Sequence, residues 1–351
     1  MREQARHNRM AAEVPGVLAG MLGAEPDEVD VRREDPSGTG SVVYAVSHAF
    51  AVEFKMTASA AVVAKAAHQA LQHASHLRRK AVPLVAVPFM GEVGRRVCED
   101  SGVAWLDLSG NAHIVAKGLR VVVDGRPNRF RSAGRPANLF APKSSRVVRW
   151  MLIHPGRAFR QRELAQATGV DEGFVSRIVR RLEREQYVIR DEDSAVRPRD
   201  NDLLLDAWRE AYEFERHTVH RGHVAARSGD ALLKSACKAF AGQGVDYAAT
   251  GLAAAWVLTH FAAFRTATIY LTAEPSRAVL EKLGFRSDPK GANLWLVVPN
   301  DEGVFHGSAA KNGIRCVHPV QAYLDLKAHP ERADGAAERL RGDMLIWSRD
   351  A

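Results

Sequence analysis

A carboxylate and a lysine stand one residue apart in residues 51–55 (AVEFK). Side chains alternate across a β-strand, so Glu53 and Lys55 share one face if this segment is extended. A carboxylate there can hold a divalent cation while the lysine orients a water for phosphodiester cleavage. Such a site needs a further acid on the preceding strand, but residues 41–46 (SVVYAV) contain none, and the nearest acid is Asp35 in a Pro/Gly-rich loop. We therefore expect no catalytic residue and no cofactor. The alternative is that Glu53, Lys55 and Asp35 cleave DNA with Mg²⁺.

The arginines of residues 171–185 (DEGFVSRIVRRLERE) suit nucleic acid rather than catalysis. In a helix, the apolar residues fall at the i, i+3, i+4, i+7 spacing of one buried face. These residues are Val175, Ile178, Val179 and Leu182. The opposite face carries small polar and cationic side chains: Ser176, Arg177, Arg180, Arg181 and Arg184. A recognition helix needs such a face for base edges and phosphates, although a solvated helical bundle is the alternative.

The neighbouring segments supply the rest of a winged helix-turn-helix over residues 144–200. Residues 145–153 form a helix face with Ser144 or Ser145 as N-cap, and residues 161–168 (QRELAQAT) form a second, short helix. Gly169 supplies the turn to the third helix, which Asp171 caps. Residues 188–190 and 196–198 flank an acidic turn and predict a hairpin wing. We expect base contacts from Ser176, Arg177 and Arg180, and phosphate contacts from Arg181, Arg190, Arg197 and Arg199.

A basic stretch precedes this domain. Residues 126–149 contain seven Arg or Lys and no Asp or Glu, and prolines and glycines interrupt them, which predicts a basic linker with its centre at 131–143. Arg135 lies in one of two Gly-Arg-Pro tripeptides, and such arms insert into narrow minor grooves; a plain solvated linker is the alternative. The formal net charge of +8 also favours a polyanionic partner such as double-stranded DNA.

Composition excludes several other classes. Three widely separated cysteines, Cys98, Cys237 and Cys316, fit neither a disulfide framework nor a cysteine zinc site and suit a reducing compartment. The three histidines of residues 68–76 share no good metal-binding face. The apolar stretch near the N-terminus is short and contains Pro15, so it is a poor signal peptide, and no run is long enough to span a membrane. We expect a cytoplasmic protein without a membrane partner.

Both flanks of the winged helix read as α/β domains, so the predicted fold class is multidomain α/β. Strands and helices alternate in residues 1–130, including a helix at 58–77, strands at 82–87 and 103–108, and one strand at 115–123. A polar helical connector is expected at 201–225. A second α/β pattern fills 226–345, with strands near 247–249, 266–271 and 294–298.

The Glu-x-Lys pair, the alanine-rich helix with Gln69 and the strand at 82–87 resemble the order of the PD-(D/E)XK nuclease core. This resemblance implies a restriction-endonuclease-like N-terminal domain. Its alternative function is a metal-dependent DNA endonuclease that the winged helix directs to its target.

Other segments resemble the AbiEi family of antitoxins from type IV toxin–antitoxin systems. They are residues 105–112 (WLDLSGNA), 247–255 (YAATGLAAA), 317–326 (VHPVQAYLDL) and 336–341 (AAERLR), and the resemblance covers residues 83–341. It implies a transcriptional autorepressor that counters a nucleotidyltransferase toxin, with or without touching it. This sequence departs from smaller members by its long N-terminal domain and its central winged helix.

The C-terminal segment resembles a nucleotidyltransferase fold, with Thr250 and Gly251 where such enzymes keep a Gly-Ser turn. The strand expected to carry their metal-binding carboxylates, residues 266–272 (TATIYLT), has none. We therefore expect an inactive, scaffold-like domain, on whose surface His260, Arg265 and Arg286 have no assigned role. A protein-interaction scaffold is a third hypothesis for the whole chain, and homodimerisation stays open.

Overall fold

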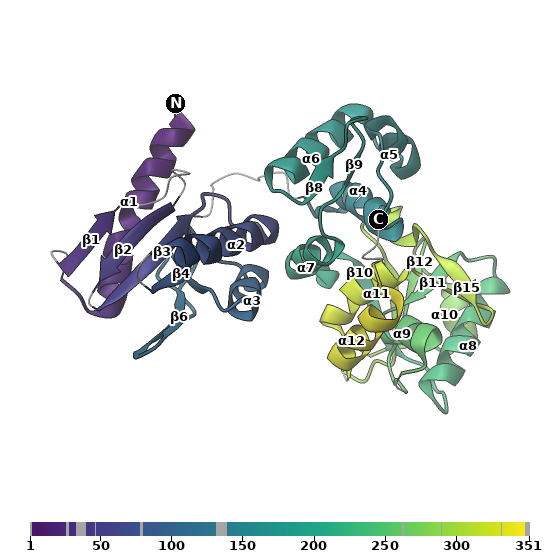
Figure 1. Ribbon diagram of the computed structural model, residues 1–351. Helices are drawn as coiled ribbons and strands as arrows, with labels where there is room; N and C mark the ends of the chain where they lie inside the picture. The colour runs from purple at the N-terminus through teal and green to yellow at the C-terminus, as the bar shows by residue number, and fades with distance from the viewer. Residues whose placement is uncertain are drawn as a thin grey trace. The chain divides into compact units, whose positions relative to one another are not determined.

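The computed structural model of the chain describes residues 2–25, 28–32, 40–45, 47–77, 80–130, 139–261, 263–288, 290–330 and 332–347. Two compact units are present. The first comprises Met1–Pro136, Leu182–Val188 and Asp202–Glu210, and the second comprises Ala137–Arg181, Ile189–Asn201 and Ala211–Ala351. Both units contain a mixed sheet with helices, which confirms a multidomain α/β protein (Figure 1).

The N-terminal sheet keeps its strands in chain order, β1-β2-β3-β4-β5-β6-β7. The three central strands, β3 to β5, run parallel, and the pairs on either side of them are antiparallel. Parallel neighbours need crossover connections, which helices α2 and α3 provide. The bounds are β1 (Val29–Arg32), β2 (Gly40–Ala45), β3 (His48–Phe54), β4 (Ala81–Val87), β5 (Ala104–Asp107), β6 (Ala112–Ala116) and β7 (Leu119–Val123).

Two apolar clusters cover the two faces of this sheet. Helix α1 (Arg2–Leu22) contributes Met10, Val14 and Leu18 to the first cluster. Helices α2 (Ala60–His76) and α3 (Glu92–Asp100) contribute to the second. Alternate residues of β4 enter opposite clusters, Leu84 and Ala86 the first and Val85 and Val87 the second. Because side chains alternate between the two faces of the sheet and both faces are covered, the domain has three layers: helix, sheet and helix.

The single strand expected at residues 115–123 is wrong. The chain forms a hairpin there, in which β6 and β7 pair from Ala112↔Val123 to Ala116↔Leu119. Gly118 adopts a φ of +77° between the strands, a left-handed conformation that glycine reaches without steric cost. Lys117 and Gly118 interrupt the apolar residues at this turn, a signal that the sequence analysis did not use.

The central segment has the winged helix arrangement (Figure 1). Its elements are α4 (Pro142–Ile153), α5 (Gln161–Thr168), α6 (Glu172–Arg184), β8 (Val188–Arg190) and β9 (Val196–Pro198). Gly169 ends α5 with a φ of +64°, and Val170 is buried directly after it. Strands β8 and β9 pair as the wing, and Phe159 pairs with Val196 beside it.

Helix α4 starts earlier than expected. Ala141 is its N-cap and Pro142 lies in its first turn, while both Ser144 and Ser145 are buried inside the helix. Proline is well suited to a first helical turn because its missing N–H has no partner there in any case. The Ser145 hydroxyl donates to the Pro142 carbonyl oxygen at 2.7 Å. The predicted N-cap is therefore wrong by three residues or more, and the basic linker does not extend to Arg149.

The C-terminal sheet has the order β13-β10-β14-β12-β11-β16-β15. Strands β12 and β14 are parallel, as are β11 and β16, and the other pairs are antiparallel. The strands are β10 (Thr218–His223), β11 (Tyr247–Thr250), β12 (Ala267–Leu271), β13 (Arg286–Ser287), β14 (Leu294–Val298), β15 (Ala309–Lys311) and β16 (Ile314–Cys316). Helix α7 (Asn201–Ala211) precedes this sheet in the chain, and its residues Asp202–Glu210 belong to the first unit. The helices that follow are α8 (Gly229–Ala241), α9 (Gly251–Thr259), α10 (Arg277–Leu283), α11 (Pro319–Asp325) and α12 (Ala333–Met344), with short helices at Phe214–Arg216, Glu302–Phe305 and Leu326–Ala328.

The helical connector expected over residues 201–225 is only half correct. Helix α7 ends at Ala211, and β10 then pairs with both β13 and β14 inside the sheet. The strand sequence TVHRGH has one buried residue and lacks the apolar alternation that signals a strand. Its pairing depends on β13 and β14, which are far away in the sequence.

Candidate nucleic-acid interface

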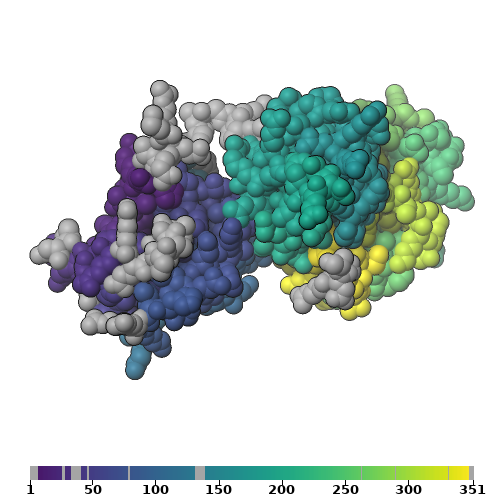
Figure 2. All heavy atoms as spheres, turned by 45° about the horizontal axis from the view of Figure 1, so that its top comes forward, coloured from purple at the N-terminus to yellow at the C-terminus, as the bar shows by residue number. Residues whose placement is uncertain are grey.

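Helix α6 presents two chemically different faces. Its apolar stripe, from Val175 to Leu182, is buried, as the spacing predicted. On the other side Arg177, Arg180 and Arg184 are exposed, while Ser176 and Arg181 are half-buried. The structure thus brings the predicted contact residues together on one helix. Figure 2 shows the surface of this part of the chain, coloured teal, turned toward the viewer.

The start of α6 holds a cation–aromatic group that the sequence analysis missed. Asp171 caps the helix, since its carboxylate accepts the N–H of Phe174 at 2.8 Å. Two cations contact the Phe174 ring: its centroid is 5.4 Å from Lys143 Nζ and 5.6 Å from Arg177 Cζ. Cation–π contacts at this distance hold the long cationic chains over the ring. The sequence signal was an aromatic residue one helical turn before Arg177.

The wing carries exposed cations on both of its strands and acids at its tip. Arg190, Arg197 and Arg199 are exposed, as are the three acids of residues 191–193. The Asp191 carboxylate accepts the N–H of Ala195 at 2.7 Å, and Arg190 donates to the carbonyl oxygen of Ser194 at 2.9 Å. These bonds fix the hairpin. Because the tip is acidic, the sides of the wing, rather than its tip, suit contact with phosphates.

The remaining predicted contact, Arg135, lies outside the described residues. Two other basic residues that the sequence analysis placed in the linker belong to α4 and have internal partners. Arg146 forms a forked ion pair with Asp301, with nitrogen–oxygen distances of 2.8–2.9 Å, and a further pair with Glu302 at 3.0 Å. Hydrogen bonding to Asp301 raises the pKa of Arg146. These charges hold the winged helix on the C-terminal domain instead of facing DNA.

Arg149 makes a second connection between these parts of the second unit. Its side chain is buried and donates to the side-chain oxygen of Gln321 at 2.6 Å. Burial lowers the pKa of Arg149. Gly303 lies against both arginines: a Cβ there would be 2.8 Å from Arg149 Nη1 and 2.9 Å from Arg146 Cγ. The absence of a side chain at Gly303 thus permits the close approach of α4.

The predicted Thr250-Gly251 turn belongs to a buried polar network rather than to a metal site. Asp325 is fully buried and accepts hydrogen bonds from the hydroxyls of Thr250, Tyr212 and Tyr270. The Gln321 amide also donates to Asp325, at 2.8 Å. Burial raises the pKa of Asp325 to about 6. The Thr250 hydroxyl thus has a structural partner, and neighbouring β12 (ATIYL) supplies no carboxylate.

The Glu53–Lys55 pair in the N-terminal domain is formed as the alternation predicted. The Lys55 ammonium lies 3.0 Å from the Glu53 carboxylate, which is 2% exposed. Gly40 of β2 lies opposite Glu53 in the sheet, and the described residues of β2 (GSVVYA) include no acid. Asp35, the third residue of the alternative catalytic site, lies outside the described residues. Among the described residues, no group of three or more His, Cys, Asp or Glu is placed to hold a metal ion.

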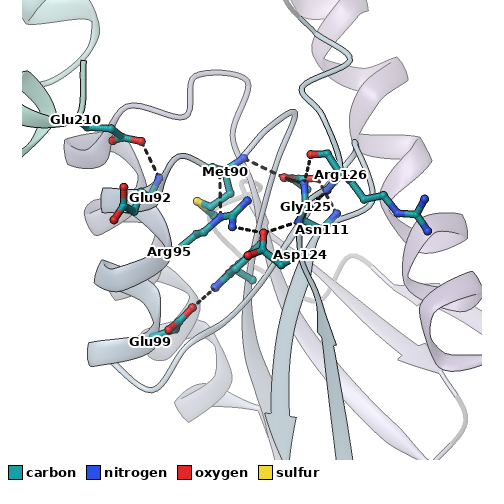
Figure 3. A network of polar contacts seen from close by, with 11 residues as sticks. Met90, Glu92, Arg95, Glu99, Asn111, Asp124, Gly125, Arg126 and Glu210 are labelled. Carbon is teal, nitrogen blue, oxygen red and sulfur yellow. Dashed lines mark hydrogen bonds and ion pairs between the residues drawn. The ribbon is translucent and has the colours of Figure 1, made fainter. Parts of the chain in front are cut away.

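Other acids of this domain have structural partners (Figure 3). Asp107, at the end of β5, is fully buried and accepts from the N–H of Met90 and from the amide of Asn111. Asp124 pairs with Arg95. The Glu210 carboxylate accepts the N–H of Glu92 at 2.7 Å, at the first turn of α3, where a helix favours negative charge. These acids stabilise loops and a helix end.

Comparisons with known families agree with this geometry. Residues 141–197 match the model of the MarR family, and residues 197–346 match a model described as "Transcriptional regulator, AbiEi antitoxin, Type IV TA system". No significant match was found among curated proteins or among solved structures. No helix among the described residues is both long and apolar enough to cross a membrane.

The MarR match, together with the exposed arginine face of α6, defines the class: a DNA-binding transcriptional regulator with a winged helix. The second match shows that residues 197–346 are similar to regulators of the AbiEi antitoxin kind from type IV toxin–antitoxin systems. The predicted AbiEi resemblance is confirmed for residues 197–346, and the predicted winged helix is confirmed for residues 141–197. Neither match includes residues 1–140.

Proposed function

We propose that the chain reads an operator by placing the N-terminal half of α6 in the major groove. The observation that carries this proposal is the exposure of Arg177 and Arg180 on a helix whose other face is buried. Recognition helices contact base edges through their first turns, and arginine forms paired hydrogen bonds with guanine. Ser176 directly precedes Arg177 on the same helix and is short enough to donate to either a base or a phosphate.

Phe174 supports this reading in two ways. Its ring holds Arg177 by a cation–π contact, which reduces the rotamer entropy that Arg177 loses on binding. It also stands in the first turn of α6, where an apolar side chain can contact the methyl group of thymine. Lys143, which also lies over the ring, adds a cation for a nearby phosphate.

The wing and the second half of α6 supply phosphate contacts in this proposal. Arg197 and Arg199 are exposed beside the hairpin, and Arg181 is half-buried on α6. Arg190 is oriented by its bond to the Ser194 carbonyl oxygen. Arg135 adds a minor-groove contact from the basic linker. Such contacts set the register of the protein on the duplex without reading its sequence.

The proposed operator is the promoter of the chain's own gene, and the proposed counterpart is a nucleotidyltransferase toxin. In this proposal the C-terminal domain is a nucleotidyltransferase-like scaffold, which the lack of acids on β12 supports. The N-terminal domain is a restriction-endonuclease-like scaffold that retains Glu53 and Lys55. A homodimer would place two α6 helices about 34 Å apart, one turn of DNA, so the protected site would span two half-sites.

Fluorescence anisotropy with the DNA upstream of the gene tests the operator proposal. Arg177→Ala is expected to weaken binding by about 1–3 kcal/mol and to relax base preference at one position. Arg277→Ala is the matched control, because Arg277 lies on α10, is 91% exposed and pairs only locally with Glu281. Absence of DNA binding at low salt, or equal binding by both variants, would overturn the proposal.

Co-expression tests the antitoxin proposal separately. The chain is expected to restore growth to cells that produce its proposed nucleotidyltransferase toxin. A full-length chain that represses its promoter but gives no such rescue would restrict the function to regulation. Pull-down of the toxin distinguishes direct neutralisation from action on the toxin's target.

A further inference from the structure

A basic cavity opens in the C-terminal domain at one end of its sheet. Its volume is about 530 Å³. It lies where β10 ends and where β12 and β14 begin, since Gly222 and Ala267 both pair with Leu294. Cavities of about 300–1,000 Å³ hold small organic ligands, and this one is far larger than a single phosphate group requires.

Three cationic side chains line the cavity: Arg227, Arg265 and Lys290. All three are exposed to solvent. The described lining residues include no Asp or Glu. Of two acids nearby, Asp230 pairs with Lys234 at 2.8 Å, whereas Asp288 accepts the N–H groups of Lys290 and Gly291 and keeps its negative charge. The three cations of the lining outnumber this carboxylate. The lining therefore favours a ligand with several negative charges.

The walls of the cavity are held in place by hydrogen bonds. Asn293 bridges them: its Oδ1 accepts the N–H of Val224, and its Nδ2 donates to the Val224 carbonyl oxygen, both at 2.9 Å. Gly229, the first residue of α8, lies against the segment before Arg265. A Cβ on Gly229 would be 2.1 Å from the Phe264 carbonyl oxygen. Backbone packing therefore fixes where the main chain carries Arg227 and Arg265, while their exposed side chains can adjust to a ligand.

Apolar side chains complete the lining. Pro330 is exposed in the same cavity as the three cations, and Leu232 forms part of the wall behind it with 1% of its surface exposed. A ligand that fits has a charged part for the cations and an uncharged, partly apolar part for these side chains. We propose that this cavity binds a nucleotide with two or three phosphates, its phosphates against Arg227, Arg265 and Lys290. This site is separate from the exposed face of α6 and does not depend on the operator proposal.

Titration calorimetry on the full chain tests the proposal with ATP, GTP, inorganic pyrophosphate and adenosine as probes. ATP or GTP is expected to bind at sub-millimolar concentration, pyrophosphate more weakly and adenosine not measurably. Because the described lining has no carboxylate, EDTA is expected to leave the affinity unchanged. Arg227→Ala and Lys290→Ala are each expected to weaken nucleotide binding by about tenfold or more, the usual value of a charge-assisted hydrogen bond.

Arg277→Ala serves as the control, as it removes an exposed cation of the same domain away from the cavity. Circular dichroism confirms that the variants fold, and operator binding is measured on the same samples. The proposal is overturned if neither nucleotide binds, if adenosine binds as well as ATP, or if all three variants bind alike. It is also overturned if the cavity variants weaken only DNA binding, which would assign the cations to the DNA backbone. Loss of operator binding in Arg177→Ala, with nucleotide binding intact, would support two independent sites.

Discussion

The guanidinium of Arg149 on α4 donates to the side-chain oxygen of Gln321 on α11 at 2.6 Å, and both residues are buried. The Gln321 amide donates in turn to Asp325 and to the Tyr212 hydroxyl. A helix of the DNA-binding domain is thus bonded to the polar centre of the C-terminal domain. Together with the Arg146–Asp301 pair, this contact makes the winged helix and the antitoxin-type domain one packed body.

Replacing only one partner of the Arg149–Gln321 contact should lower the free energy of unfolding more than expected from the effect of replacing both partners together. Gln321→Leu leaves the buried guanidinium without this acceptor, and Arg149→Met removes the charge while keeping a long side chain. Buried charges are costly when a partner is lost, and replacing both partners by apolar groups is cheaper. We expect the double variant to cost about 1–3 kcal/mol less than the sum of the two single variants. Denaturant unfolding measures this, and strictly additive costs would contradict it.

Gly303 provides a packing test of the same interface. A Cβ there would be 2.6 Å from the Asp301 carboxylate and 2.8 Å from Arg149 Nη1, so Gly303→Ala must displace one of these two side chains. We expect it to lower the free energy of unfolding by about 1–3 kcal/mol. The matched control is Gly342→Ala in α12, where no atom lies within 4 Å and alanine should stabilise the helix by about 0.5–1 kcal/mol. Equal effects of the two substitutions would argue against tight packing at Gly303.

The sequence predicted α6 and the wing well because both are local patterns. The four apolar residues of α6 are all buried, and the predicted hairpin segments coincide with β8 and β9. Gly169 and Asp171 also take their predicted roles as turn and cap. Periodicity and capping depend on neighbours within one or two turns, which the sequence lists directly.

The roles of Arg146 and Arg149 could not be predicted in the same way. Their partners, Asp301 and Gln321, are more than 150 residues away in the chain. In the sequence both arginines continue a basic stretch without acids, which is also the composition of a solvated linker. Strand β10 was missed for a similar reason, since only distant neighbours make its polar sequence extended.

Arg197 should contribute affinity but no base preference. It is exposed on the wing, so in the operator proposal it faces a phosphate. Arg197→Ala is expected to weaken binding to specific and scrambled DNA by the same factor, and to reduce the slope of log affinity against log salt by about 0.9. Anisotropy titrations at several salt concentrations measure both effects. A change in sequence preference would instead place Arg197 at a base edge.

The Glu53–Lys55 pair should not support cleavage. The β2 residue opposite Glu53 is a glycine, which offers no second carboxylate. The Glu53 carboxylate already forms an ion pair with the Lys55 ammonium at 3.0 Å. We expect supercoiled plasmid to stay intact with magnesium or manganese, for the native chain and for Glu53→Gln alike. Nicking by the native chain that Glu53→Gln abolishes would establish a nuclease and revive Asp35 as a metal ligand.

His318 should make stability fall as the pH falls. Its Nδ1 accepts the N–H of Val320 at the start of α11, and burial lowers the pKa of the imidazole to about 4 from an ordinary 6.5. Between these values the folded chain binds fewer protons than the unfolded chain, so acidification favours unfolding. The stability that depends on the neutral His318 imidazole is fully present above about pH 6.5 and is lost toward pH 4. This loss is on the order of 2–3 kcal/mol of unfolding free energy.

His318→Asn isolates this effect, because asparagine keeps a side-chain acceptor at the N-cap and does not titrate. His217, whose pKa burial also lowers to about 4, stays in both proteins, so both should lose stability in acid. We expect the loss between pH 6.5 and pH 4 to be smaller in the variant by about the contribution of His318. Unfolding by urea at half-unit pH steps measures the difference. Two parallel curves would show that the His318 imidazole charges as readily in the folded chain as in the unfolded one.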